Sequence, residues 1–157
     1  MPSINIIVGP PCAGKSSFVV DNAQAGDVLV DLDKIAMALG SEVSHSSYGA
    51  VKSAALAARS AVIEIILSGV DSDAWIIDTS PRQEQINNYE AAGAIFYLLN
   101  PGLEECNKRA DKDSRPDETK AAIANWYENQ PNLPESTIVN NSKPFKVALA
   151  RRRLELI

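Results

Sequence analysis

The chain has 157 residues, of which 45% are hydrophobic and 22% charged, a composition that is typical of one globular domain. Its formal charge of −5 argues against a protein that coats nucleic acid, although a local basic patch could still bind it. No apolar run of about eighteen residues is present, and residues 1–3 do not begin a secretory signal. We therefore expect a cytoplasmic protein without a membrane partner, in the host cytoplasm if it is phage-encoded.

Short apolar runs alternate with helical patterns along the whole chain. Patterns typical of buried strands lie at residues 4–8, 28–32, 74–78, 94–99 and 137–140. Helical patterns lie at residues 14–23, 34–39, 48–68, 82–92, 103–110, 117–129 and 144–156. Five buried strands separated by helices predict a three-layer α/β/α fold with a five-stranded parallel sheet, in a single domain over residues 1–157. Ligands of such sheets bind at the carboxyl ends of the strands.

A glycine-rich loop follows the first strand pattern and precedes a helix. Its sequence, Gly9-Pro10-Pro11-Cys12-Ala13-Gly14-Lys15-Ser16, matches the phosphate-binding pattern G-x-x-x-x-G-K-[ST] in full. We expect residues 9–17, ending with Ser17, to bind ATP through backbone N–H groups and the helix N-terminus. Lys15 is expected to reach the β- and γ-phosphates, and the Ser16 hydroxyl to bind Mg²⁺.

Two acids end the second strand pattern. Period-two alternation places Asp31 and Asp33 on one face, near the carboxyl end of the strand. A carboxylate there can take the proton of an acceptor hydroxyl, so we assign Asp33 as the general base, with Lys34 beside it on the substrate side. Asp31 is the candidate for a group that binds Mg²⁺. The alternative is that Asp33 only caps the helix that begins at Lys34.

Another acid ends the third strand pattern. Asp78 occupies a position suited to binding Mg²⁺ or its water. Arg82 follows closely and could point into the same cleft, or could begin a solvated helix. On the long helix, Lys52 and Arg59 share one face and, with Tyr48 and His45, could line an acceptor pocket. A solvated helix face is the alternative.

Cations gather after the fourth strand pattern, at Lys108, Arg109, Lys112 and Arg115. We expect a lid over about residues 109–117 that closes on the nucleotide, with Arg109 and Arg115 neutralising charge on the transferring phosphoryl group. A solvated loop is the alternative, because acids are interleaved among these cations.

The two cysteines, Cys12 and Cys106, are expected to be free thiols, as is usual in a cytoplasm. We interpret Cys12 as a small residue that the loop tolerates, with a redox switch as the alternative.

Four features together resemble the kinase domain of phage polynucleotide 5′-hydroxyl kinases. They are the glycine-rich loop, the acid after the second strand, Ile77-Asp78-Thr79, and residues 105–109 through Arg115-Pro116. That group is similar to zeta-toxin-like and other small P-loop kinases. The resemblance implies that Lys15 and Ser16 bind ATP and Mg²⁺, that Asp33 is the general base, and that Arg109 contacts the transferring phosphates. One departure is Ala36, where the family has an arginine. Asp31-x-Asp33 and Arg115-Pro116 also look like shikimate kinase, but the third strand ends without a triple glycine.

We therefore predict an ATP-dependent kinase that uses Mg²⁺ and transfers the γ-phosphoryl group to a hydroxyl. The first-choice acceptor is the 5′ end of a nucleic acid. The alternatives are a nucleoside, nucleotide or modified base, or a P-loop ATPase that acts as a switch on a protein partner.

Overall fold

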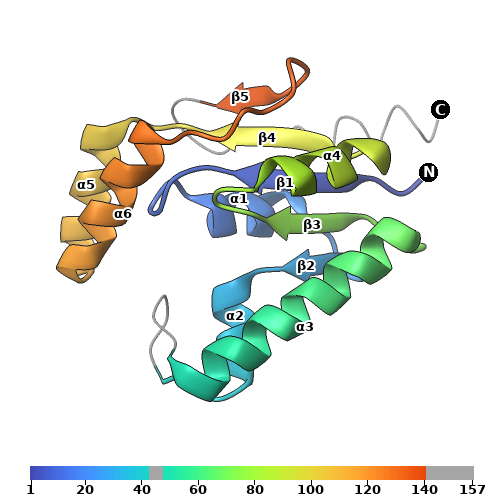
Figure 1. Cartoon of the computed structure of the whole chain (residues 1–157), viewed down its shortest axis with the longest axis horizontal. Helices are drawn as coiled ribbons and strands as arrows, with labels where there is room; N and C mark the ends of the chain where they lie inside the picture. The colour runs from blue at the N-terminus through green and yellow to red at the C-terminus, as the bar shows by residue number, and fades with distance from the viewer. Residues whose placement is uncertain (43–47, 141–157) are drawn as a thin grey trace.

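The structure is a computed structural model that describes residues 1–42 and 48–140. In chain order the elements are β1 (Ile4–Val8), α1 (Lys15–Asn22), β2 (Val28–Val30), α2 (Leu32–Ala38), α3 (Gly49–Ser68), β3 (Ala74–Ile77), α4 (Gln83–Ala91), β4 (Ile95–Leu99), α5 (Leu103–Lys112), α6 (Asp117–Glu128) and β5 (Ile138–Asn140) (Figure 1). The predicted helix over residues 144–156 and the predicted role of His45 fall outside the described residues. Within those residues, no helix is both long and apolar enough to cross a membrane.

The five strands form one parallel sheet in the order β2-β3-β1-β4-β5, which confirms the predicted fold class. β1 lies at the centre, where Ile6 pairs with Ile76 of β3 and with Phe96 of β4. The strands run in one direction, so their carboxyl ends meet at one edge, on the left in Figure 1. The loop after β1 therefore opens at the middle of this edge.

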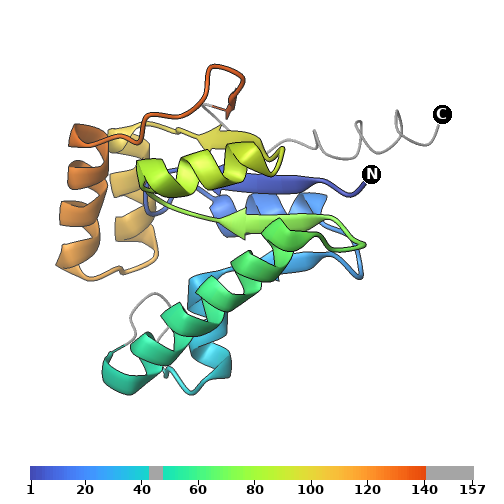
Figure 2. The same ribbon diagram turned by 45° about the vertical axis from the view of Figure 1, so that its right-hand side comes forward.

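Side chains of β1 alternate between two apolar layers. Ile6 and Val8 pack in a cluster with residues of α3, α4 and α6, whereas Ile7 packs in a second cluster with Phe18 and Val19 of α1. Figures 1 and 2 show α3 and α4 in front of the sheet and α1 behind it. The helices thus cover both faces, as predicted for a parallel sheet.

The position of α1 follows from the strand order. The chain moves from β1 past β3 to reach β2, and it moves in the opposite direction from β2 to β3, from β3 to β4 and from β4 to β5. Because crossover connections are right-handed, a reversal of direction moves the connecting helix to the other face. The loop after β1 therefore lies at the switch point of the sheet, where such folds bind their ligands.

The second strand is shorter than predicted. β2 ends at Val30 and α2 begins at Leu32, so Asp31 and Asp33 do not share a strand face as period-two alternation suggested. Asp31 caps α2 instead, because its Oδ1 accepts a 3.1 Å hydrogen bond from the backbone N–H of Asp33. Aspartate is among the residues most favoured at the N-cap of a helix. With this capping bond, α2 begins at Leu32, two residues before the predicted start at Lys34.

The predicted lid segment lies in a helical pair. α5 continues to Lys112, and a short turn at residues 113–116 leads into α6. Both helices stand beyond the carboxyl ends of the central strands (Figure 1). A hydrogen bond of 2.7 Å from Trp126 Nε1 to the carbonyl oxygen of Thr79 ties α6 to the end of β3. Arg109 is thus carried by a packed helix, and Arg115 by the turn.

Candidate active site

The phosphate-binding loop, residues 9–16, joins β1 to α1 at the carboxyl edge of the sheet. A Cβ atom on Gly9 would lie only 2.5 Å from the carbonyl oxygen of Leu99, so the loop can approach β4 this closely only with glycine. Gly14 precedes α1 with a φ of 89°, a left-handed conformation that glycine adopts without strain. Close packing against β4 therefore requires glycine at position 9, and the left-handed backbone conformation favours glycine at position 14.

The first turn of α1 is suited to an anion. The residue before it is Gly14, which has no side chain to cap the helix, and the turn itself contains no acidic residue. The first N–H groups of a helix have no partner within the helix, and they carry the positive end of its dipole. A phosphate group can satisfy both at once.

Lys15 is folded against its own loop. Its Nζ donates hydrogen bonds of 2.8 Å and 2.6 Å to the carbonyl oxygens of Gly9 and Pro10, and the residue is 9% exposed. Burial lowers the pKa of Lys15 to about 8, although the nearby charges of Cys106, Cys12, Asp31 and Asp33 act in the opposite direction. The loop thus contains a lysine that gives up its proton unusually easily.

Ser16 and Asp31 are joined directly. The Ser16 hydroxyl donates a 2.8 Å hydrogen bond to Oδ2 of Asp31, whose residue is 8% exposed. This bond connects the start of α1 with the start of α2. A hydroxyl and a carboxylate oxygen at this spacing are the hard ligands that Mg²⁺ prefers, so the pair fits the ion that the loop sequence implies.

Asp33 lies on the same side of the sheet edge, although the sequence argument that placed it there extended β2 beyond Val30, where the strand ends. The residue is half-buried in the first turn of α2. Its charge and that of Asp31 both raise the pKa of Lys15, which requires that both carboxylates lie near the lysine. The fold therefore brings the two acids and the phosphate-binding loop together.

Asp78 belongs to a network behind this group. Its Oδ2 accepts a 3.0 Å hydrogen bond from the Tyr89 hydroxyl and pairs with Arg59 Nη2 at 3.3 Å. The same Arg59 nitrogen donates a 3.2 Å hydrogen bond to the carbonyl oxygen of Ile77. The predicted Mg²⁺ carboxylate at the end of β3 is thus engaged with α3 and α4.

Three of the four residues that we considered for an acceptor pocket, Tyr48, Lys52 and Arg59, lie in the described part of the chain, and the structure separates Arg59 from the other two. Arg59 reaches the end of β3, whereas Lys52 and Tyr48 are exposed. No local pattern distinguished Arg59 from Lys52, because the difference depends on where α3 crosses the sheet. Lys34 and Arg82, the other predicted acceptor-side cations, are also exposed.

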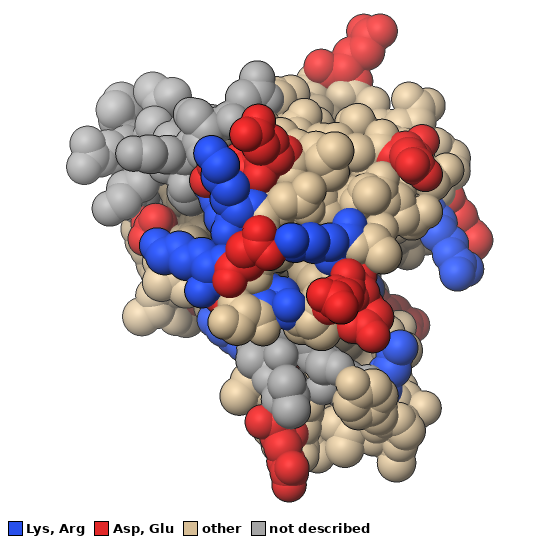
Figure 3. All heavy atoms as spheres, turned by 90° about the vertical axis from the view of Figure 1, so that its left-hand side faces the viewer, with Lys and Arg blue, Asp and Glu red and all other residues tan. Residues whose placement is uncertain are grey.

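Arg109 is the cation of the helical pair that touches the loop. Its Nη1 donates a 3.2 Å hydrogen bond to the carbonyl oxygen of Cys12, and its Nε donates a 3.1 Å bond to Glu105 one turn earlier. Arg115 lies half-buried in the turn between α5 and α6. Figure 3 views this edge of the molecule and shows Lys and Arg side chains near the middle, with Asp and Glu side chains among them.

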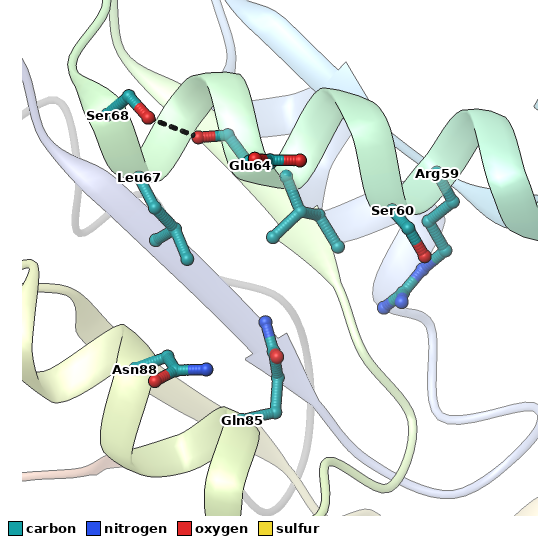
Figure 4. A pocket seen from close by; sticks show the side chains of 8 residues that line it. Arg59, Ser60, Glu64, Leu67, Ser68, Gln85 and Asn88 are labelled. Atoms are coloured by element: carbon teal, nitrogen blue, oxygen red, sulfur yellow. Dashed lines mark hydrogen bonds between the residues drawn. The ribbon is translucent and has the colours of Figure 1, made fainter.

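A separate pocket of about 360 Å³ lies between α3 and α4. Figure 4 shows Gln85 and Asn88 of α4 facing Arg59, Glu64 and Leu67 of α3 across it. No residue of the phosphate-binding loop lines this pocket. Arg59 connects it with the network around Asp78, but the nucleotide-binding features lie elsewhere.

Comparison with known proteins places the fold. No family model matches the chain, and neither does any curated protein. Among solved structures, a shikimate kinase from Acinetobacter baumannii, in complex with shikimate, is similar with a TM-score of 0.56 and 15% identity over 99% of this chain and 93% of that chain. A sugar kinase from a Janibacter species is similar with a TM-score of 0.59 and 14% identity over 99% of this chain and 94% of that chain.

A tunicamycin resistance protein from Deinococcus radiodurans is also similar, with a TM-score of 0.53 and 10% identity over 99% of this chain and 95% of that chain. At sequence identities this low the similarity shows a shared fold alone, and it extends over almost the whole of each chain. The chain therefore has the α/β fold of P-loop kinases, with a five-stranded parallel sheet and the phosphate-binding loop at its centre.

Proposed function

We propose that the chain is an ATP-dependent kinase that transfers the γ-phosphoryl group to a hydroxyl acceptor. The observation that carries the proposal is the grouping of Lys15, the Ser16–Asp31 hydrogen bond and Asp33 at the switch point of the sheet. A phosphate site and a carboxylate that can take a proton then lie side by side. Phosphoryl transfer to a hydroxyl needs at least these two groups, one to bind the phosphates and one to accept the proton.

The nucleotide phosphates bind at the uncapped start of α1. Lys15 contributes its ammonium group from within the loop, where burial makes each electrostatic contact stronger than it would be in water. The residues of 9–17 other than Pro10 and Pro11, which have no N–H group, supply backbone N–H groups around the phosphates. The loop thus binds ATP and ADP mainly through the backbone and one lysine.

Ser16 and Asp31 would hold Mg²⁺. The ion, when bound, neutralises charge on the phosphates and orients them for transfer. Asp31 also keeps its capping bond to the Asp33 amide, and this bond fixes where α2 begins. Asp78 supports the site from the end of β3, where Arg59 and Tyr89 hold its carboxylate.

Asp33 takes the proton of the acceptor hydroxyl as the oxygen attacks the γ-phosphorus. Its place at the start of α2 is fixed by the hydrogen bond of its own amide to Asp31. Lys34 and Arg82 are exposed cations near the ends of β2 and β3, where they can attract an anionic acceptor.

The lid, about residues 109–117, spans the last turn of α5, the turn after it and the start of α6. In the structure Arg109 already contacts the loop, through the carbonyl oxygen of Cys12. We propose that Arg109 and Arg115 turn toward the phosphates when the nucleotide binds, where they stabilise charge in the transition state. Closure also excludes water, which favours transfer over hydrolysis.

The acceptor that we place first is the 5′-hydroxyl of a polynucleotide, on the strength of the sequence resemblance. The similarity in fold to a shikimate kinase and a sugar kinase supports a small hydroxyl compound as the second candidate.

A transfer screen with γ-labelled ATP tests the proposal. The acceptors are 5′-hydroxyl DNA and RNA oligonucleotides, nucleosides, nucleotides, sugars and hydroxy acids. We expect label on one acceptor class with the wild-type protein, and none with the Lys15→Met variant. Release of labelled phosphate at the same rate with every acceptor, or without one, would instead identify an ATPase and contradict the kinase assignment.

A further inference from the structure

The fold brings the two cysteines together. Cys12 lies in the phosphate-binding loop and packs against the apolar cluster that Cys106 forms with Ala110 and Ile123 of the α5–α6 pair. The charge of either sulfur raises the pKa of Lys15, so both sulfur atoms lie near the same ammonium group. Residues that are far apart in the sequence thus meet where the lid contacts the loop.

Arg109 fixes this arrangement. Cys106 and Arg109 are three residues apart and therefore share one face of α5. The 3.2 Å hydrogen bond from Arg109 Nη1 to the carbonyl oxygen of Cys12 holds that face against the loop. Cys12 itself has a φ of 64°, an uncommon conformation for a residue other than glycine. The loop accepts this strained conformation at the residue that contacts α5.

The two thiols differ in access to solvent. Cys12 is partly exposed, whereas Cys106 has no exposed surface. An oxidant from solution therefore meets Cys12 first. Cys106 is the neighbouring thiol that can react with the oxidised sulfur of Cys12. Burial raises the pKa of Cys106, so Cys106 stays a protonated thiol until Cys12 has been oxidised.

We propose that Cys12 and Cys106 form a reversible disulfide under peroxide, and that this bond closes the phosphate-binding loop to nucleotide. The Cys12 thiol loses its proton and the thiolate attacks one peroxide oxygen, so that the O–O bond breaks; the other oxygen takes up the proton and leaves as water, and Cys12 becomes a sulfenic acid. The Cys106 sulfur then attacks the Cys12 sulfur, the S–S bond forms, and the oxygen leaves as a second water. Two thiols lose two electrons and two protons in total, and hydrogen peroxide takes them up. A dithiol reverses the reaction by exchange.

The bond blocks nucleotide binding through the lid. A disulfide restricts the Cα atoms of its cysteines to roughly 4.4–6.8 Å, so it would fasten α5 to the loop. Arg109 would then stay on the carbonyl oxygen of Cys12 and could not turn to the phosphates. By linkage, a bound nucleotide that moves the lid should protect the thiols to the same degree. This inhibitory effect rests on the proposed nucleotide-binding function, whereas the disulfide itself does not.

The experiment treats the full-length protein with hydrogen peroxide, then maps its peptides without reduction. We expect loss of both free thiols, a linked peptide pair that contains Cys12 and Cys106, and recovery of the thiols with dithiothreitol. Wild-type affinity for ADP should fall at least about fivefold on oxidation and return on reduction. Saturating ADP, added first, should slow the loss of thiols.

Cys106→Ala and Cys106→Ser serve as matched variants, because both remove the resolving thiol and leave the loop intact. In either variant, peroxide should leave a sulfenic acid on Cys12 that a dione reagent traps, and no intramolecular disulfide. The wild-type map alone decides the chemistry, even if a variant folds poorly. Free thiols after treatment, or disulfides only between molecules, would overturn the proposal. A disulfide that leaves ADP affinity unchanged would overturn its inhibitory part.

The two proposals fail in different ways. If the reduced protein binds ADP and no disulfide forms, only the redox inference is wrong. If the disulfide forms but the reduced protein binds no nucleotide, the proposed function is wrong and the thiol pair remains.

Discussion

The hydroxyl of Ser16 lies 2.8 Å from the carboxylate of Asp31, so the last residue of the phosphate-binding loop is bonded directly to the residue that caps α2. One aspartate thus has two partners, with Oδ1 on the Asp33 amide and Oδ2 on the Ser16 hydroxyl. The bond connects the proposed nucleotide site with the proposed acceptor side. Five predictions concern the residues along this connection, from Lys15 and Ser16 to Asp33 and the lid.

Asp31→Asn tests the proposed Mg²⁺ site. Asparagine caps a helix about as well as aspartate, so the fold and the melting temperature should change little. The carboxylate charge is lost, and we expect Mg²⁺ to bind the nucleotide complex about 10- to 100-fold more weakly. Calorimetry of ADP binding with and without Mg²⁺ measures the effect. Asp71→Asn, at an exposed position, is the control, and an equal loss in both variants would remove Asp31 from the site.

The lowered pKa of Lys15 leads us to predict that nucleotide binding depends on pH. Its pKa is lowered from 10.5 to about 8 in the free protein, chiefly by burial, and phosphates should raise it again. ADP binding should then take up a proton above pH 8, and affinity should fall as pH rises through that value. Calorimetry in buffers of different ionisation enthalpy detects the proton. Binding of ADP without proton uptake at pH 9 would contradict the assignment.

The same shift affects stability. Between pH 8 and 10.5 the unfolded chain keeps a proton on Lys15 that the folded chain has lost. Because stability rises with pH wherever the unfolded state binds more protons, this residue should stabilise the fold increasingly across that range. Denaturant titrations of the wild type and Lys15→Met measure it, and the variant should lack this contribution.

Asp33→Asn tests the general base. Asp31 makes the capping bond, and asparagine keeps the shape of the Asp33 side chain, so we expect the helix to remain. Loss of the proton acceptor should reduce single-turnover transfer by roughly 10²–10⁴ while ATP affinity stays close to that of the wild type. If the variant transfers phosphate at the normal rate, the base is another residue, and Asp31 is the next to examine.

Arg109→Ala tests the lid. The side chain donates to the carbonyl oxygen of Cys12 in the free protein, and we expect it to interact with the phosphates more strongly in the transition state than in the bound nucleotide. Turnover should therefore fall more than ADP affinity, by about 10²-fold or more if the arginine stabilises transition-state charge. Lys108→Ala, the exposed neighbour on the same helix, is the matched control. Full activity in the Arg109 variant would reduce the segment to a structural helix.

The elements that depend on local signals could be predicted from the sequence. A strand, a glycine-rich loop and a helix follow one another within residues 4–22, and each signal lies within a few neighbouring residues. The three central strands were also recognisable, because strands covered on both faces need continuous apolar runs, whereas the edge strands β2 and β5 expose Leu29 and Val139 and are not buried as predicted. The boundary at Asp31 was not, since a strand end and a capping aspartate look alike until the hydrogen bond to the Asp33 amide is seen.

The sequence by itself determined the phosphate-binding loop and the α/β class, because both rest on residues close together along the chain. Only the tertiary structure decided which distant residues meet at that loop. The strand order places β3 beside β1, and with it the Asp78–Arg59 pair. The packing of α5 on the loop brings Arg109 and Cys106 to Cys12. These contacts depend on crossover direction and helix packing, which no short stretch of sequence encodes.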